Sequence, residues 1–257
     1  MPLHSVVLHC PEEPERSRAL AAVLQLPLTG ISPDDGALVL QWLDGRLVIR
    51  ETGAGAPGPV TVDFVSGGLD YRRQYGGGEL IVRACGGSQH ARLRVIDATA
   101  GLGRDSFMLA CHGFPVSLFE RNAIVHALLA DGLARARGVD DALLNQIIAN
   151  MTLLEGDCID ALRTGQLAEA PVILIDPMFP PSKKSAFVKK EMRLFHQLIG
   201  PDTDGGELLS AALDRVIYRV VVKRPVKAEC LGGIKPSHSL KGKAVRFDIY
   251  AKKALPA

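Results

Sequence analysis

The stretch from Val95 to Asp105, Val-Ile-Asp-Ala-Thr-Ala-Gly-Leu-Gly-Arg-Asp, constrains the fold more than any other part of the chain. A short apolar run ends on an acid, a Gly-x-Gly turn follows, and a helical pattern begins at Asp105 and runs to His112. This order predicts a strand, a tight loop and a helix N-terminus. Glycines in such a loop let the backbone approach a nucleotide-like ligand closely.

The same order of a strand followed by a helix recurs down the rest of the chain. Strands are expected at residues 95–97, 116–120, 152–155, 172–176, 218–223 and 244–251. Helices are expected at residues 104–112, 123–137, 158–164, 190–198 and 207–215. Alternating units of this length predict an α/β fold, a Rossmann-like parallel sheet covered by helices on both faces.

Residues 1–66 have a different pattern and predict a small N-terminal α/β unit. Strands are expected at residues 6–9, 37–43, 46–51 and 60–65, with a helix at 14–24. The dipeptide Asp44-Gly45 favours a two-residue hairpin turn between two of them. Residues 67–90 are predicted to be a Gly-rich connector with a short helix at 79–85, and residues 91–257 are predicted to form the Rossmann-like domain.

Composition narrows the class of protein further. Hydrophobic residues make up 47% of the chain, enough for a large core. No apolar stretch is long enough to span a membrane, and the N-terminus lacks the pattern of a secretion signal, so we expect a cytoplasmic protein. The cysteines are scattered without metal-ligand spacing, which favours reduced thiols over disulfides and predicts no metal.

The charges are distributed unevenly along the sequence. Residues 1–176 hold 14 Arg, no Lys and 21 acids, a net charge of −7. Residues 177–257 hold 16 basic and 7 acidic residues, a net charge of +9. A basic C-terminal third is typical of a surface that binds a polyanion, although a merely solvated lysine surface has the same composition.

Acids stand at or just after the ends of four successive strands. They are Asp97, Glu120, Asp157 and Asp176. Ligands of open α/β sheets bind beyond the carboxyl ends of the strands, so these acids predict a site. Glu120 lies 19 residues past Gly101, where a carboxylate binds ribose hydroxyls in both NAD-binding and S-adenosylmethionine-binding domains. Ser106 replaces the third glycine of the dinucleotide pattern, which disfavours a nicotinamide dehydrogenase.

The last of these strands leads into Asp176-Pro177-Met178-Phe179-Pro180-Pro181. This segment resembles the Asp/Asn-Pro-Pro-Tyr/Phe motif of S-adenosylmethionine-dependent methyltransferases that act on the exocyclic amines of bases. Such an amine is a poor nucleophile because its lone pair is delocalised into the ring. Hydrogen bonds to the Asp176 carboxylate and the Pro177 carbonyl would free that lone pair for in-line attack, and Phe179 would stack on the base. These three residues are the predicted catalytic residues.

Several further segments carry a closer family resemblance. They are residues 97–105, Phe119-Glu-Arg-Asn122, residues 176–180, Lys189-Lys-Glu-Met-Arg193, Val220-Val-Val-Lys-Arg-Pro225 and Arg246-Phe-Asp-Ile-Tyr250. Together they resemble the bacterial small-subunit ribosomal RNA guanine-N2 methyltransferase J family. The resemblance implies methylation of the N2 amine of a guanosine in 16S rRNA, on naked RNA or in the small ribosomal subunit, with S-adenosyl-L-methionine as cofactor.

The resemblance also implies which residues surround the cofactor. By motif position they are Asp97, Gly101, Gly103, Arg104, Asp105, Glu120, Arg121, Asp157, Cys158 and Asp176. Cys158 is equally well explained as an inert thiol. Basic residues near the proposed amine site and in the Gly-rich connector are predicted to contact RNA: Arg72, Arg73, Lys183, Lys184, Lys189, Lys190, Lys223 and Arg224.

Two other functions are compatible with the sequence. One is methylation of adenine N6 or cytosine N4. The other is a non-catalytic protein that holds S-adenosylmethionine and RNA during ribosome assembly.

Overall fold

The computed structural model describes residues 6–31, 33–66, 79–167, 170–178, 194, 198–200 and 203–256. The chain divides into two compact units. Unit 1 comprises Met1–Val62, Asn122–Gly132 and Met178–Asp202, and unit 2 comprises Asp63–Arg121, Leu133–Pro177 and Thr203–Ala257. The domain boundaries expected near residues 66 and 90 stay a prediction. No helix in these described ranges combines the length and the apolar character that a membrane crossing needs.

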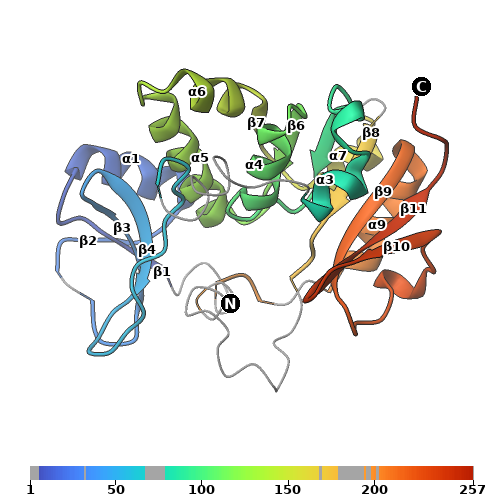
Figure 1. Cartoon of the computed structure of the whole chain (residues 1–257). Helices are drawn as coiled ribbons and strands as arrows, with labels where there is room; N and C mark the ends of the chain where they lie inside the picture. The colour runs from blue at the N-terminus through green and yellow to red at the C-terminus, as the bar shows by residue number, and fades with distance from the viewer. Residues whose placement is uncertain are drawn as a thin grey trace. The chain divides into compact units, whose positions relative to one another are not determined.

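Unit 1 contains a four-stranded sheet with one helix from the N-terminal segment (Figure 1). Its elements are β1 (Val6–His9), α1 (Pro14–Leu24), β2 (Leu28–Thr29), β3 (Leu38–Leu43) and β4 (Arg46–Glu51). The strand order is β2-β1-β3-β4, with β1 parallel to both neighbours and β3 antiparallel to β4. Asp44 and Gly45 both have positive φ, at 49° and 70°, as the predicted hairpin turn requires.

The prediction of a strand at residues 60–65 was wrong. Val60 forms a single bridge with Ile49, and the chain then turns. The Asp63 carboxylate accepts hydrogen bonds from the backbone N–H groups of Val65 at 2.8 Å and Ser66 at 3.1 Å. An acid that bonds its own following backbone favours a turn over an extended strand, which the alternation of apolar residues did not reveal.

Unit 2 is organised around a seven-stranded sheet with the order β10-β11-β9-β8-β5-β6-β7. The strands are β5 (Val95–Asp97), β6 (Val116–Phe119), β7 (Met151–Leu154), β8 (Ala170–Ile175), β9 (Val216–Pro225), β10 (His238–Lys241) and β11 (Val245–Ala251). All pairs from β7 to β9 are parallel, whereas β11 runs antiparallel to both β9 and β10. The strand order reverses at β5, so its carboxyl end is the switch point at which a ligand site is expected.

Helices cover both faces of this sheet, as the sequence predicted. The helices of unit 2 are α3 (Leu80–Cys85), α4 (Arg104–Cys111), α6 (Ala142–Ala149), α7 (Cys158–Thr164) and α9 (Gly205–Arg215), with short 3-10 turns η2 (Ser88–His90) and η3 (Leu231–Gly233). Helix α5 (Ala123–Arg137) is divided between the units after Gly132. Val95 and Ile96 point to opposite faces of β5 and both are buried. Ile96 packs in a core with α7 and α9, while α3 and α4 contact the sheet and α6 contacts α4.

Helix α6 and strand β10 were not predicted from the sequence. The signal for α6 was present, because Asp141 caps it by accepting a hydrogen bond from the Leu144 N–H at 2.9 Å. Strand β10 is short and polar, as edge strands often are, so it has little hydrophobic pattern. The helix predicted at residues 190–198 lies almost wholly outside the described residues.

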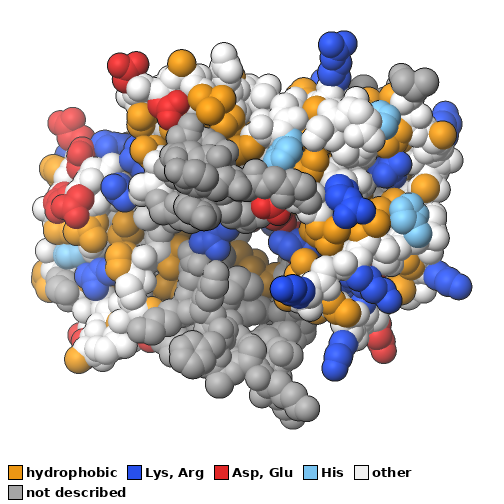
Figure 2. All heavy atoms as spheres, viewed as in Figure 1, with side chains coloured by type: hydrophobic (Ala, Val, Ile, Leu, Met, Phe, Trp, Pro, Cys, Tyr) orange, Lys and Arg blue, Asp and Glu red, His pale blue; other side chains and the backbone are white. Residues whose placement is uncertain are grey.

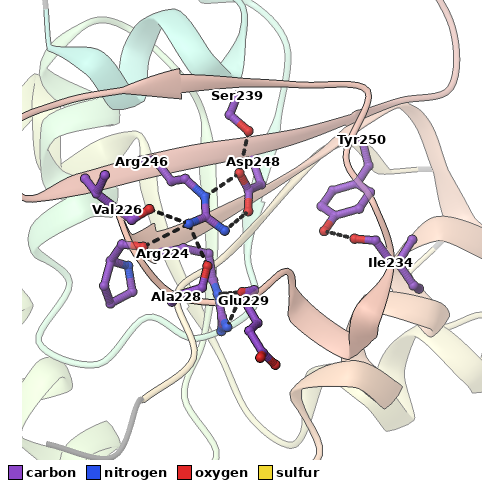
Figure 3. A network of polar contacts seen from close by, with 10 residues as sticks. Arg224, Val226, Ala228, Glu229, Ile234, Ser239, Arg246, Asp248 and Tyr250 are labelled. Atoms are coloured by element: carbon purple, nitrogen blue, oxygen red, sulfur yellow. Dashed lines mark hydrogen bonds and ion pairs between the residues drawn. The ribbon is translucent and has the colours of Figure 1, made fainter. Parts of the chain in front are cut away.

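A buried arginine fixes the segment that leaves the end of β9 (Figure 3). The Arg246 guanidinium makes a bidentate pair with Asp248, through Nε at 2.8 Å and Nη2 at 3.0 Å. Its Nη1 donates to three backbone carbonyls, those of Pro225 at 3.1 Å, Val226 at 2.8 Å and Ala228 at 2.7 Å. The end of β9 and the turn that follows it thereby have three carbonyl groups hydrogen-bonded inside the protein.

Candidate active site

Asp97 ends the central strand and is almost fully buried, with 2% of its surface exposed. It accepts a hydrogen bond from the Ser106 hydroxyl at 2.6 Å and another from the Thr99 N–H at 3.2 Å. The pKa of Asp97 is raised to about 7, mainly by burial and also by the nearby carboxylates of Asp105 and Asp176, while the two hydrogen bonds oppose the rise. The acid at this strand end therefore shares its surroundings with two others.

The glycine loop after β5 takes the shape that its sequence predicted. Gly101 and Gly103 have φ of 53° and 72°, in the left-handed region that favours glycine. The Gly101 N–H donates to Oε2 of Glu120 at 2.9 Å, and Gly103 immediately precedes α4. The loop, the helix N-terminus with Arg104 and Asp105, and the acid after β6 are thus brought together.

Arg121 joins the starts of two helices. Its guanidinium donates to both carboxylate oxygens of Asp204, with the Nη2 contact at 3.1 Å, and lies 3.6 Å from Oδ2 of Asp157. The hydrogen bond and charge of Arg121 lower the pKa of Asp204. Asp157 in turn caps α7 by accepting from the Ile159 N–H at 2.7 Å. Asp204 was not predicted as part of the site, although an acid directly before a helix is a recognisable signal.

Cys158 is the first residue of α7, and its side chain is buried in the core. Burial raises the pKa of the Cys158 thiol to about 12, and the neighbouring carboxylates of Asp157 and Asp97 act in the same direction. The side chain is therefore a neutral thiol, unsuited to nucleophilic chemistry. This environment matches the inert thiol that the sequence left open.

Asp176 follows β8 and is fixed through both its backbone and its side chain. Its N–H donates to Oγ1 of Thr99 at 2.7 Å, and its Oδ2 lies 2.8 Å from Nζ of Lys223. The same ammonium lies 2.6 Å from Oδ2 of Asp105. The sequence did not single out Thr99, which stands in the loop after β5 and holds the loop after β8.

Pro177 lies where α9 begins. A Cβ added at Gly205 would meet Cδ1 of Leu231 at 3.0 Å and Cβ of Pro177 at 3.6 Å. Glycine at the start of α9 thus allows η3 and the Pro177 segment to approach the helix closely. The loop after β8 is therefore supported from the α9 side as well as by Thr99.

Two residues predicted to bind RNA phosphate have a different environment in the structure. Lys223 is held between two carboxylates. Arg224 is 7% exposed, and its guanidinium donates to the Glu229 carbonyl, with the Nε contact at 3.0 Å. Because both cationic groups are already engaged inside the protein, we leave both residues out of the RNA surface proposed below. The other predicted contacts, Arg72, Arg73, Lys183, Lys184, Lys189 and Lys190, and the predicted stacking residue Phe179, lie outside the described residues.

No group of His, Cys, Asp and Glu in the described ranges has the geometry to hold a metal ion. What the site offers is a set of carboxylates around a glycine loop. Such a site suits a ligand with hydroxyl groups and positive charge.

A family model described as "Putative SAM-dependent methyltransferase" matches residues 20–252, so the chain is an enzyme of the S-adenosylmethionine-dependent methyltransferase class. The crystal structure of a SAM-dependent methyltransferase from Neisseria gonorrhoeae matches with a TM-score of 0.74 at 34% identity, over 98% of this chain and 97% of that one. A Pseudomonas fluorescens protein named "Ribosomal RNA small subunit methyltransferase J" is 53% identical over 87% of this chain and 86% of its own. A protein of the same name from Marinobacter nauticus is 48% identical over 98% and 92%. This chain belongs to the ribosomal RNA small subunit methyltransferase J family.

Proposed function

We propose that this enzyme transfers the methyl group of S-adenosylmethionine to the exocyclic N2 amine of a guanosine in the 16S RNA of the small ribosomal subunit. The names of the relatives support the class of RNA, and the resemblance of residues 176–180 to the amine-methylating motif supports the chemistry. The observation that carries the proposal is the position of Asp176, an acid fixed at the switch point beside the glycine loop. Such a substrate implies a cytoplasmic enzyme.

The residues of unit 2 fit the cofactor. Glu120, already bonded to Gly101, would accept hydrogen bonds from the ribose hydroxyls. Among the described residues, no atom beyond Gly101 and its two chain neighbours lies within 4 Å of the place where a Gly101 Cβ would be, which leaves room for a ligand to approach the loop backbone. The other proposed contacts are Asp97, Gly103, Arg104, Asp105, Arg121, Asp157 and the Cys158 position. When bound, the cofactor supplies an electrophilic methyl group on a positively charged sulfur, which these carboxylates complement.

Asp176 and Pro177 would prepare the amine for attack. Their carboxylate and carbonyl oxygens would accept its two N–H bonds, which favours a pyramidal nitrogen with its lone pair directed at the methyl carbon. Phe179 would hold the base by stacking. The protein thus contributes orientation and electrostatic stabilisation, and no metal is required.

A basic surface at the carboxyl edge of the sheet supports an RNA substrate. Lys227, Lys241 and Lys243 are exposed. The Val226 N–H donates to the Ala244 carbonyl at 3.3 Å, which brings the segment after β9 beside the turn between β10 and β11. Lysine and arginine side chains gather over these strands in Figure 2. Such a surface contacts phosphates without regard to base sequence.

The test is a methyl-transfer assay with labelled S-adenosylmethionine and small subunits from a strain that lacks the enzyme. We expect N2-methylguanosine in digested RNA, and its loss with Asp176→Ala. Asp214→Ala, at an exposed position on α9, is the matched control and should retain activity. Label in N6-methyladenosine or N4-methylcytidine would contradict the proposed target, and cofactor binding without transfer to any RNA would indicate a non-catalytic assembly factor.

A further inference from the structure

Lys223 links two acids that come from different parts of the chain. It lies on β9, whose residue Val222 is in register with Ile175, the last residue of β8, so Lys223 lies beside Asp176, which directly follows β8. Its Nζ lies 2.8 Å from Oδ2 of Asp176 and 2.6 Å from Oδ2 of Asp105 at the start of α4. The three side chains are 24%, 36% and 22% exposed, so solvent screens them only in part.

The contact between Lys223 and Asp176 matters for ionisation, because other acids lie close to Asp176. The carboxylates of Asp97 and Asp105 both act on this corner of the sheet, and the buried Cys85 thiol near them stays neutral because burial raises its pKa. Carboxylates that share a site resist simultaneous ionisation. Burial alone would lower the pKa of Lys223, but the charges of Asp176 and Asp105 outweigh burial and raise it. The ammonium therefore stays charged and offsets the repulsion between the acids.

We propose that Lys223 is a positioning residue of the methyl-transfer reaction, which holds Asp176 ionised and fixed so that Asp176 accepts hydrogen bonds from the amine and does not take up its proton. The proposal rests on the function proposed above. An adjacent cation stabilises a carboxylate in its ionised form and makes it a weaker base. An acid that has a cation at 2.8 Å is thus suited to polarising an amine and poorly suited to deprotonating it.

Methyl transfer to the amine makes one bond, breaks one bond and releases one proton. The nitrogen lone pair forms a bond to the methyl carbon, while the pair of the carbon–sulfur bond stays on sulfur, which becomes a neutral thioether. The nitrogen then carries the positive charge and loses one proton to water. Asp176 remains a carboxylate throughout, so turnover does not wait for it to release a proton.

The first measurement does not depend on the substrate. In full-length protein labelled with 13C-aspartate, the Asp176 carboxyl signal is assigned by its loss in Asp176→Asn and then titrated. We expect the midpoint in Lys223→Met to lie at least about one pH unit above that of the wild type, and Lys223→Arg to stay close to the wild type. Equal midpoints in the wild type and Lys223→Met would overturn the proposal. Lys223→Gln is a second variant should Lys223→Met fail to fold.

The second measurement follows methyl transfer to unmethylated small subunits across pH. We expect Lys223→Met to lower kcat roughly tenfold or more and to shift the acidic limb of the pH profile of kcat to higher pH. Lys223→Arg should restore most of the wild-type kcat and most of the wild-type pH profile. A shifted midpoint with unchanged kcat would overturn the positioning role. A wild-type product other than N2-methylguanosine would instead overturn the proposed function, while the titration still decides whether Lys223 controls Asp176.

Discussion

Oγ1 of Thr99 accepts a hydrogen bond from the backbone N–H of Asp176 at 2.7 Å. This contact joins the loop after β5, which carries the glycines, to the loop after β8, which we propose binds the amine. The two loops are 77 residues apart in sequence. Beyond the pairing of β5 with β8, this hydroxyl therefore adds a direct link between the loop assigned to the cofactor and the loop assigned to the base.

Thr99→Val should lower kcat/KM by roughly tenfold or more, because it leaves a partly buried N–H unsatisfied and releases Asp176 from its position. Thr99→Ser keeps the hydroxyl and is the matched control, with activity expected close to the wild type. Steady-state methyl transfer measures both. Equal activity in Thr99→Val and Thr99→Ser would show that the hydrogen bond does not position the acid.

The raised pKa of Asp97 makes stability depend on pH in a defined direction. The unfolded acid titrates near its ordinary value of 3.8, while the folded acid titrates near 7, so between these values the folded state binds the extra proton. This group's contribution to the free energy of unfolding therefore falls as pH rises through that window and is constant above it. Asp97→Asn removes the effect, and its stability relative to the wild type should rise by roughly 2–3 kcal/mol between pH 5 and pH 8.

Urea unfolding at the two pH values measures this difference. Asp214→Asn, at an exposed position, is the control and should run parallel to the wild type. If the free energy of unfolding of Asp97→Asn changed with pH as that of the wild type does, burial would not be holding Asp97 in its protonated form.

Gly132 on α5 packs against Val62, so a side chain should not be tolerated there. A Cβ at Gly132 would lie 2.4 Å from Cγ1 of Val62. Gly132→Ala should destabilise the protein by about 1–3 kcal/mol, even though alanine favours a helix by about 1 kcal/mol. The double variant Gly132→Ala with Val62→Ala should recover part of the loss, and a double-mutant cycle by urea unfolding measures the coupling. Additive effects would contradict the close contact.

The two ends of β11 provide a matched test of the basic surface. Lys241 and Lys243 lie at the carboxyl edge of the sheet, whereas Lys252 and Lys253 follow the other end of the strand. Lys241→Gln with Lys243→Gln should weaken RNA binding and reduce the slope of log affinity against log salt by about 1 to 2. Lys252→Gln with Lys253→Gln should leave the slope nearly unchanged. Equal effects of the two double variants on RNA binding would argue against an RNA-binding surface at the carboxyl edge of the sheet.

Helices and loops that depend mainly on nearby residues could be predicted from the sequence. The Gly-x-Gly loop, the helix at 123–137 and the helix at 158–164 follow from periodicity and capping, and the structure confirms them. The acids at strand ends were predictable because parallel strands place their carboxyl ends at one edge.

The partners of Lys223 were not predictable in this way, since Asp176 and Asp105 lie 47 and 118 residues away. Asp176 meets Lys223 through the register of β9 on β8, and Asp105 meets it from the start of α4. The same holds for Arg121 and Asp204, which are 83 residues apart. The sequence shows where the lysines and acids lie along the chain. Which of them form ion pairs is decided by the tertiary fold.

The Arg246 guanidinium, which satisfies three carbonyls between Pro225 and Ala228, has a consequence for binding affinity. A segment whose shape is already set loses little conformational entropy when a ligand docks against it. The backbone that carries Lys227 is therefore preorganised. If Lys227 contacts RNA as proposed, little of the binding free energy is lost in ordering this segment, and the complex is longer-lived.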